Sequence, residues 1–342
     1  SSLTPYQIVA AVGTLAILAV FTYVKGMWQA VPFVREITYW FGMTGRSDNF
    51  MNGMICSEDV LYFVVVVLLF LLMTIIRLQS RRQKVSFLTT VGRYLGVWGI
   101  AVVLAFVSSR PVFKYYYDAT HTKKNTLTPN SQEIINQLKG GLTITTYANI
   151  LDANGWVAYP ANYNSDMRLF EQYIRFKPEI KMKYVYYYDT VANSDLNLRF
   201  PDMTMEEQAK KLAEIQNVNI KLFLTPERIR QKIDLSPEGN RFVRLLEREN
   251  GEKTFLRIYN DMLVMPQEPE ISAALKRLVM TLPKVGFLVG HGERDSKKDG
   301  ERDYSQFARQ KTFRYALINQ GFDVMDVTLN NSIPEDVNIM VI

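Results

Sequence analysis

Three long apolar stretches in the first third of the chain constrain its fold more than any other feature. They span roughly residues 8–24, 60–76 and 94–112 of a 342-residue sequence. A stretch of about 17 residues is at the short end of what crosses a hydrocarbon core of ~30 Å as a helix. From about residue 113 onward the sequence has the mixed polar and apolar character of a soluble domain. The sequence therefore predicts an integral membrane protein that carries a large soluble region.

Basic residues between the second and third stretches predict how the chain is oriented. They are Arg77, Arg81, Arg82, Lys84 and Arg93, and no acidic residue lies among them. Because basic loops stay in the cytoplasm, we expect a cytoplasmic loop at 79–93, a transmembrane anchor helix at 94–113 and an extracytoplasmic region after it. Fixing this topology is the minimal role of the first four basic residues. They are also candidates for contact with a cytoplasmic partner.

The stretch 25–57 would then face outward, yet it is rich in aromatic side chains such as Trp28, Tyr39 and Trp40. Aromatic residues of this kind favour the headgroup level of a bilayer. We therefore expect a re-entrant or interfacial helical hairpin here. An ordinary loop packed on the soluble region is the alternative.

The residue composition excludes several chemistries. Cys56 is the only cysteine, so the chain forms no intrachain disulfide, and two histidines, His121 and His291, offer few ligands for a metal centre. No GxxxxGK[ST] phosphate loop occurs, so no ATPase site is expected in the chain. The 40 Lys and Arg and the 34 Asp and Glu are dispersed along the sequence, which disfavours nucleic acid as a partner. We expect no metal, no cofactor and no catalytic residue.

The first part of the soluble region, 126–235, is predicted to be a small α/β subdomain. Thr128, followed by Pro129, predicts the start of a first helix, and Thr204 with Glu207 predicts a capping box at the start of another. Between them, strands are expected near 142–147 and 180–188 and a helix over 165–176. This order of helix, strand, helix, strand and helix indicates a thioredoxin-like fold, without the CxxC motif that thiol chemistry requires. Asn250 and Gly251 lie between two strand-like runs and predict a β-hairpin. We expect this hairpin to open a second subdomain, 236–342.

Predominantly apolar strands in the second subdomain predict a parallel sheet. They lie near 285–289, 322–327 and 337–342, with a helix expected over 304–319. This pattern is typical of a doubly wound sheet of the flavodoxin or amidotransferase type. The sequence stops within the last strand, so we expect this sheet to be incomplete and the chain to be a piece of a longer protein. The predicted fold class is an α-helical membrane part followed by an α/β extracytoplasmic region.

One short motif is the sharpest candidate for a binding site. Gly290, His291, Gly292 and Glu293 follow the first of these strands directly. Ligands of doubly wound sheets bind at the carboxyl ends of the strands, so the four residues are candidate ligand contacts. The alternative, which we favour, is that the glycines only allow a tight exit from the strand.

Several motifs together resemble a known family of transport proteins. The segment FMNGMICSEDVLYFVVVVLLFLLMTIIRLQSRR is similar to the last transmembrane helix of an ABC-2 type permease. From the third apolar stretch onward, TLTPNSQEIINQLKG, VGFLVGHGERD and QGFDVMDVTL resemble the gliding-motility-associated, GldG-like auxiliary components of ABC transporters. The resemblance implies permease helices in 1–78, fused to an auxiliary domain in the periplasm and held in a bacterial inner membrane.

The resemblance also implies the partners of the chain. A separate ABC ATPase subunit would hydrolyse ATP, the lipid bilayer would surround the apolar segments, and a homo-oligomer is left open. The chain itself would be a non-catalytic transporter subunit with an extracytoplasmic domain that binds a substrate or partner. The alternative is a membrane-anchored carbohydrate-binding protein or hydrolase with its site at Gly290–Glu293.

Overall fold

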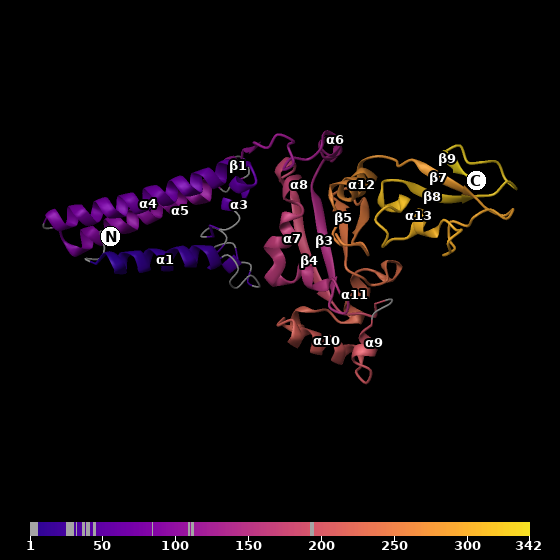
Figure 1. Ribbon diagram of the computed structural model, residues 1–342, viewed down its shortest axis with the longest axis horizontal. Helices are drawn as coiled ribbons and strands as arrows, with labels where there is room; N and C mark the ends of the chain where they lie inside the picture. Colours follow the sequence, from indigo (N-terminus) through magenta and orange to yellow (C-terminus); the bar gives the residue numbers. More distant parts are fainter. Residues whose placement is uncertain are drawn as a thin grey trace. The chain divides into compact units, whose positions relative to one another are not determined.

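The computed structural model describes residues 6–24, 31, 33–35, 38, 42–43, 46–83, 85–108, 110, 113–191 and 195–342. The chain divides into two compact units, Ser1–Thr126 and Leu127–Ile342 (Figure 1).

Apolar helices make up most of the first unit. They are α1 (Gln7–Tyr23), α4 (Ser57–Arg82) and α5 (Phe87–Ser108). The last two are long and apolar enough to cross a membrane, with 26 and 22 residues, whereas α1, with 17 residues, is shorter. Of the three expected spans, two therefore have the length that a crossing requires. These two lie side by side as a helical hairpin (Figure 1).

The connection between the two long helices is shorter than the loop expected at 79–93. Because α4 continues to Arg82 and α5 begins at Phe87, Arg77, Arg81 and Arg82 belong to the last turns of α4. Arg and Gln favour the helical conformation, and basic side chains stabilise the negative end of a helix. The helix expected at 94–113 starts early because the hydroxyl of Ser86 accepts the Thr89 amide, as an N-cap does. Lys84 lies outside the described residues.

A two-stranded sheet connects the segment before α4 with the segment after α5. The helix α3 (Arg46–Met51) leads into β1 (Met54–Cys56), which pairs antiparallel with β2 (Tyr116–Asp118). Much of the stretch 25–57, including Trp28, Tyr39 and Trp40, lies outside the described residues, so the interfacial hairpin stays a prediction.

The first sheet of the second unit has the strand order β4-β3-β5-β6. Its strands are β3 (Leu142–Asn149), β4 (Ile180–Tyr187), β5 (Val243–Arg248) and β6 (Lys253–Arg257). β3 and β4 are parallel, and β5 is antiparallel to both β3 and β6. The hairpin at Asn250 and Gly251 is thus confirmed, but it belongs to this sheet and does not open a second subdomain. β3 is buried along nearly its whole length, so it needs a hydrogen-bonded neighbour on each side, and β5 supplies the second one.

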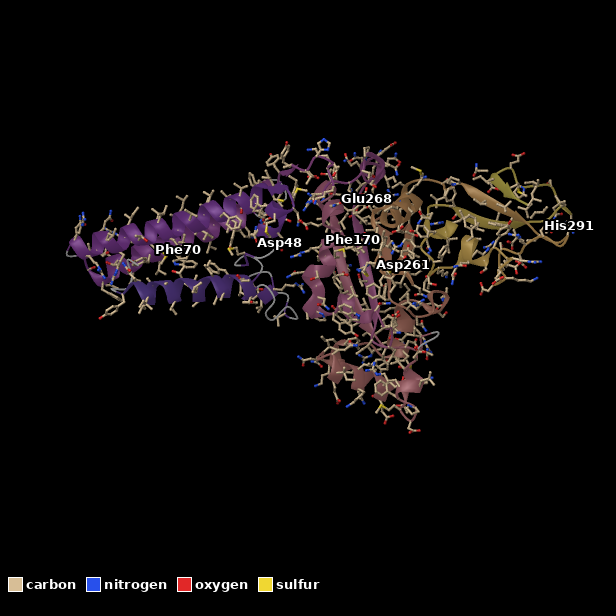
Figure 2. All side chains as sticks on the ribbon, viewed as in Figure 1. Asp48, Phe70, Phe170, Asp261, Glu268 and His291 are labelled. Atoms are coloured by element: carbon tan, nitrogen blue, oxygen red, sulfur yellow. The ribbon has the colours of Figure 1, made fainter. Side chains whose placement is uncertain are left out.

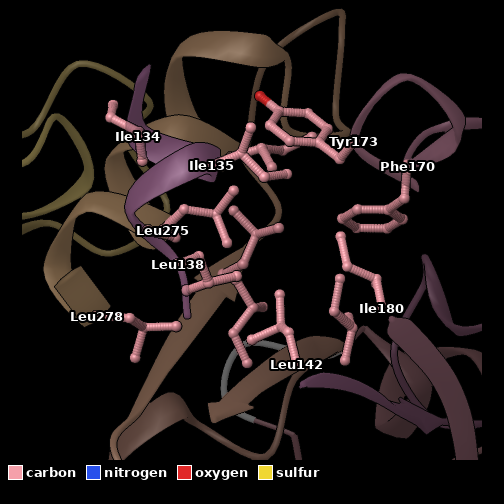
Figure 3. Close-up of a cluster of buried hydrophobic side chains, with 14 of the residues drawn as sticks. Ile134, Ile135, Leu138, Leu142, Phe170, Tyr173, Ile180, Leu275 and Leu278 are labelled. Carbon is pink, nitrogen blue, oxygen red and sulfur yellow. The ribbon is translucent and has the colours of Figure 1, made fainter. Parts of the chain in front are cut away.

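Helices cover one face of this sheet and form the main core with it. They are α6 (Pro129–Gln137), α8 (Glu171–Phe176) and α12 (Glu268–Val279). Figure 3 shows Ile135, Phe170 and Leu275 in one cluster of buried side chains with Leu142 of β3. Each such side chain contributes about 1.5–3 kcal/mol when fully buried. The expected capping at Thr128 is present, since its hydroxyl accepts the Ser131 amide at the start of α6.

The remaining helical segments are short. They are α7 (Tyr163–Arg168), α9 (Leu196–Arg199), α10 (Met205–Ile215), α11 (Pro226–Lys232) and the 3-10 turns η3 (Gly155–Ala158), η4 (Pro160–Asn162), η5 (Ile220–Leu222) and η6 (Ser236–Glu238). The capping box expected at Thr204 and Glu207 begins α10. The single helix expected over 165–176 is divided between α7 and α8, and the turn between them directs Phe170 into the core.

The second sheet is parallel, as predicted, with the order β8-β7-β9. Its strands are β7 (Lys284–Leu288), β8 (Asp323–Val327) and β9 (Val337–Val341). The helix expected over 304–319 is wrong, because only α13 (Ser305–Arg309) and η7 (Leu317–Asn319) form there. Between them Arg314 is buried and paired with Asp261 and Glu270. An ion pair with the segments next to the first sheet therefore replaces a continuous helix.

Candidate functional site

A cleft of about 810 Å3 lies in the second unit, between the outer strands of its two sheets. One wall is β6, the last strand in the order β4-β3-β5-β6, and the other is β8, the first in the order β8-β7-β9. The remaining lining comes from α12, from the start of β7, from the end of α13, from η7 and from Lys311 between the last two. A cleft between two sheet edges is unusual because edges are normally paired or covered.

Cationic side chains dominate the lining. They are Lys253, Arg257, Arg277, Lys284, Arg309 and Lys311, and the lining contains one acidic residue, Asp323. The signal in the sequence was weak, because these residues come from segments that are far apart along the chain. Among them only the alternating run Lys253-Thr-Phe-Leu-Arg257 marks two of the cations as neighbours on one strand face.

Glu238 holds two of the cations at one end of the cleft. Its carboxylate oxygens lie 2.7 Å from Nε of Arg257 and 3.0 Å from Nζ of Lys311. Burial alone would raise the pKa of Glu238, but the hydrogen bonds and charges of the two cations outweigh burial, and the pKa is lowered. Glu238 is therefore a structural anion that fixes both side chains beside the cleft.

The other pairs also orient cations around the cleft. Arg277 binds the carboxylate of Asp323 and the carbonyl oxygen of Phe322. Lys284 binds Asp336, and this hydrogen bond lowers the pKa of that carboxyl.

A fourth carboxylate, that of Asp326 on β8, also pairs with a cation of the cleft. Its Oδ1 lies 2.9 Å from Nη2 of Arg309 and 2.6 Å from the hydroxyl of Ser296. Six cations thus face four carboxylates in and around the cleft, so it is electropositive. Among the described residues none forms an ion pair with Lys253, which lines the cleft and is exposed.

The structure brings the four residues of the predicted loop site together, away from this cleft. The backbone amide of His291 donates to Oε2 of Glu293 at 2.7 Å, and Nδ1 of His291 lies 3.4 Å from Oε1. Backbone amides in the turn lower the pKa of Glu293. Gly290 and Gly292 have φ values of +112° and +96°, which residues other than glycine rarely adopt. Figure 2 shows His291 at the tip of the second sheet.

None of these four residues lines the cleft, which lies beside β8 and the amino end of β7, whereas the loop follows the carboxyl end of β7. A ligand role for the loop stays a prediction, and its geometry accounts for the two glycines without one. Among the described residues, no group of three or more His, Cys, Asp or Glu side chains is arranged to hold a metal ion.

A second charged cluster, which the sequence reasoning missed, lies at the start of α4. Arg46 lies 2.9 Å from Asp59 and 3.2 Å from Glu58, and Glu58 also binds Lys114 at 2.6 Å. Asn49 donates to Asp59 at 2.8 Å. The sequence feature that could have revealed this cluster is the acidic pair in the first turn of an apolar helix. Negative charge at that position complements the helix dipole. This cluster joins α3, α4 and the segment after α5, at the opposite end of α4 from Arg77, Arg81 and Arg82.

No known protein family, curated protein or solved structure matches this chain.

Proposed function

We propose that the chain is a membrane component of an ABC-2 type, ATP-driven transporter, with an extracytoplasmic α/β unit that binds a substrate or partner protein. In this role it belongs with the gliding-motility-associated, GldG-like auxiliary components and hydrolyses no ATP itself. A separate ATPase subunit on the cytoplasmic side supplies the energy. The chain spans the inner membrane of a bacterium, and its larger unit lies in the periplasm.

The observation that carries this proposal is a hairpin of two spanning-length helices continuing into a large α/β unit. α5 ends at Ser108, and the second unit begins at Leu127, so a short connection would transmit movement from the membrane. Anchoring a soluble enzyme requires one span. Arg77, Arg81 and Arg82 cluster at the end of α4 that would face the cytoplasm and the ATPase.

Two finer assignments of fold support the auxiliary role. We infer that the first sheet is thioredoxin-like, because two parallel strands linked by helices are followed by an antiparallel hairpin and a helix. We infer that the parallel second sheet is of the doubly wound type. With no CxxC motif in the chain, a thioredoxin-like sheet would serve binding and not thiol exchange.

Purification of the tagged full chain from its native membranes tests the proposal. We expect a phosphate-loop ATPase to co-purify and the complex, but not the chain alone, to hydrolyse ATP. Replacing Arg81 and Arg82 with Gln should weaken co-purification, whereas replacing Lys181 and Lys183, exposed on β4, should not. ATP turnover by the isolated chain would contradict the assignment. So would a preparation that lacks an ATPase but binds or cleaves a carbohydrate, which would favour the anchored carbohydrate-binding protein or hydrolase.

A further inference from the structure

We propose that the cleft between β6 and β8 binds an extended acidic segment of another protein, which adds to the free edge of β6 as a fifth strand. The inference concerns the chemistry of the cleft and does not depend on the transport role. It is carried by three features of the cleft: an open strand edge, an excess of positive charge and a second wall that limits how a ligand can enter.

The edge of β6 that faces the cleft offers backbone groups for strand pairing. The amide of Arg248 donates to the carbonyl oxygen of Glu252 at 2.9 Å, which fixes the hydrogen-bonding phase of the hairpin. Because residues of an antiparallel pair alternate, Thr254 and Leu256 bond to β5, whereas Lys253, Phe255 and Arg257 direct their amides and carbonyls away from it. No described strand pairs with that edge.

The opposite wall has a similar edge but a different charge. The Asp323 amide bonds to Pro283 and the Val289 amide bonds to Val327, both at 2.9 Å. By the alternation of a parallel pair, Val324 and Asp326 then direct their backbone groups outward. β8 carries acidic residues, however, while β6 has the sequence KTFLR with no acid. An acidic strand therefore pairs with β6, and β8 forms the opposite wall of the cleft.

The positive charge of the cleft favours an acidic segment as its ligand. Lys253 and Arg257 lie on the pairing strand, and Arg277, Lys284, Arg309 and Lys311 surround it. Main-chain pairing gives affinity, and side chains at alternate positions of the added strand give specificity. Five residues of β6 span about 17 Å, so a strand of similar length places two or three carboxylates beside these cations. Half-buried Phe255, Val324 and Met325 also line the cleft and accept apolar residues between the carboxylates.

Binding of a fluorescent peptide in which Glu and Val alternate tests this inference, with the full chain in detergent. We expect saturable binding that an otherwise identical Lys–Val peptide does not show. N-methylation of alternate peptide amides, which blocks strand pairing but keeps the charges, should weaken binding at least roughly tenfold. Hydrogen exchange should show new protection at residues 253–257.

Matched variants locate the site on β6. Lys253→Gln should weaken binding severalfold, because it removes the cation that has no ion-pair partner among the described residues. Lys181→Gln, the control on β4 at the opposite edge of the same sheet, should leave binding unchanged. Equal binding of the N-methylated peptide, full competition by inorganic phosphate, an equal effect of the two variants, or no binding by the Glu–Val peptide would each overturn the proposal.

Discussion

Arg244 on β5 and Asp166 on α7 form a two-pronged ion pair in the interior of the second unit. Nη2 of Arg244 lies 2.5 Å from Oδ1 of Asp166, and Nη1 lies 2.9 Å from Oδ2. The two side chains are only 1% and 0% exposed. Thr146 accepts a further bond from Arg244 at 2.6 Å, and the hydroxyl of Tyr184 donates to Asp166 at 2.8 Å. Side chains from the neighbouring strands β3 and β4 thus add hydrogen bonds to the ion pair, and the pair ties α7 to the sheet.

Asp166→Asn should destabilise the second unit strongly. The substitution leaves the charge of Arg244 buried without a counter-charge, and breaking such a pair costs about 3–5 kcal/mol. Thermal unfolding of the detergent-solubilised chain measures the loss. Adding Arg244→Met to Asp166→Asn should recover part of it, since the uncompensated charge is then gone. Asp202→Asn, at an exposed position, is the matched control, and an equal effect of the two single variants would contradict the argument.

Gly155→Ala should also be severe. A Cβ at this position would lie 2.1 Å from the carbonyl oxygen of Asn149 at the end of β3, so backbone must move. Overpacking of this kind costs typically about 1–3 kcal/mol. Gly141→Ala is the control: its Cβ would lie 2.5 Å from a carboxylate oxygen of Glu249, an exposed side chain that can rotate away. Comparable losses of melting temperature in the two variants would contradict this reading.

Periodicity and capping signals in the sequence were sufficient to predict most elements of the second unit. Strands near β3, β4, β7 and β8 and the helices that begin after Thr128 and Thr204 all formed close to their expected positions. These signals are local, since a cap or an alternating run depends on residues a few positions apart. The assignment of the hairpin to a second subdomain failed because strand order depends on contacts between distant segments, here between β3 and β5.

The cleft could not be predicted from the sequence for the same reason. Arg257 and Lys311 become neighbours only because both bind Glu238, and no pattern in the sequence links these three positions. The buried Arg314 likewise interrupts an expected helix through contacts with Asp261 and Glu270. The Gly290–Glu293 loop stood out in the sequence as a candidate site because a short contiguous motif is visible without the fold.

Stability should depend on Glu238 in a specific pH range. Its pKa is lowered from an ordinary value of 4.5 in the folded chain, so folding favours the ionised form. The stabilisation is therefore fully present above the pKa of the unfolded chain and is lost as the pH falls through the lowered folded pKa. The difference in melting temperature between wild type and Glu238→Gln should be largest near neutral pH and shrink below pH 4.5. Glu133→Gln, at an exposed position, is the control and should change the melting temperature little.

The orientation of the chain can be tested by cysteine labelling in intact cells. In a Cys56→Ser background, Lys84→Cys should be protected from a membrane-impermeant reagent, because the positive-inside rule predicts a cytoplasmic position for the basic residues near the end of α4. Asn250→Cys, in the hairpin turn between β5 and β6, should be labelled. Labelling at position 84 without labelling at 250 would reverse the topology.

Substitutions in the turn after β7 separate a structural role from a chemical one. Gly290 has a φ of +112°, so Gly290→Ala should destabilise the second unit by ~1 kcal/mol or more, although a Cβ there meets no atom within 4 Å. Gly251→Ala, at a φ of +90° and also with open space around its Cβ, is the matched control and should cost a similar amount.

Glu293→Gln completes the test of this turn. The amide oxygen of Gln can still accept the bond from the His291 backbone, which Glu293 now accepts at 2.7 Å. The melting temperature and the activity in a complementation assay should therefore both be unchanged, whereas Glu293→Ala, which removes the acceptor, should lower the melting temperature. If the turn bound a ligand through its carboxylate, the pattern would differ: Glu293→Gln would fold normally and fail to complement. That outcome would show that the motif at Gly290–Glu293 has a chemical role that the backbone geometry alone does not require.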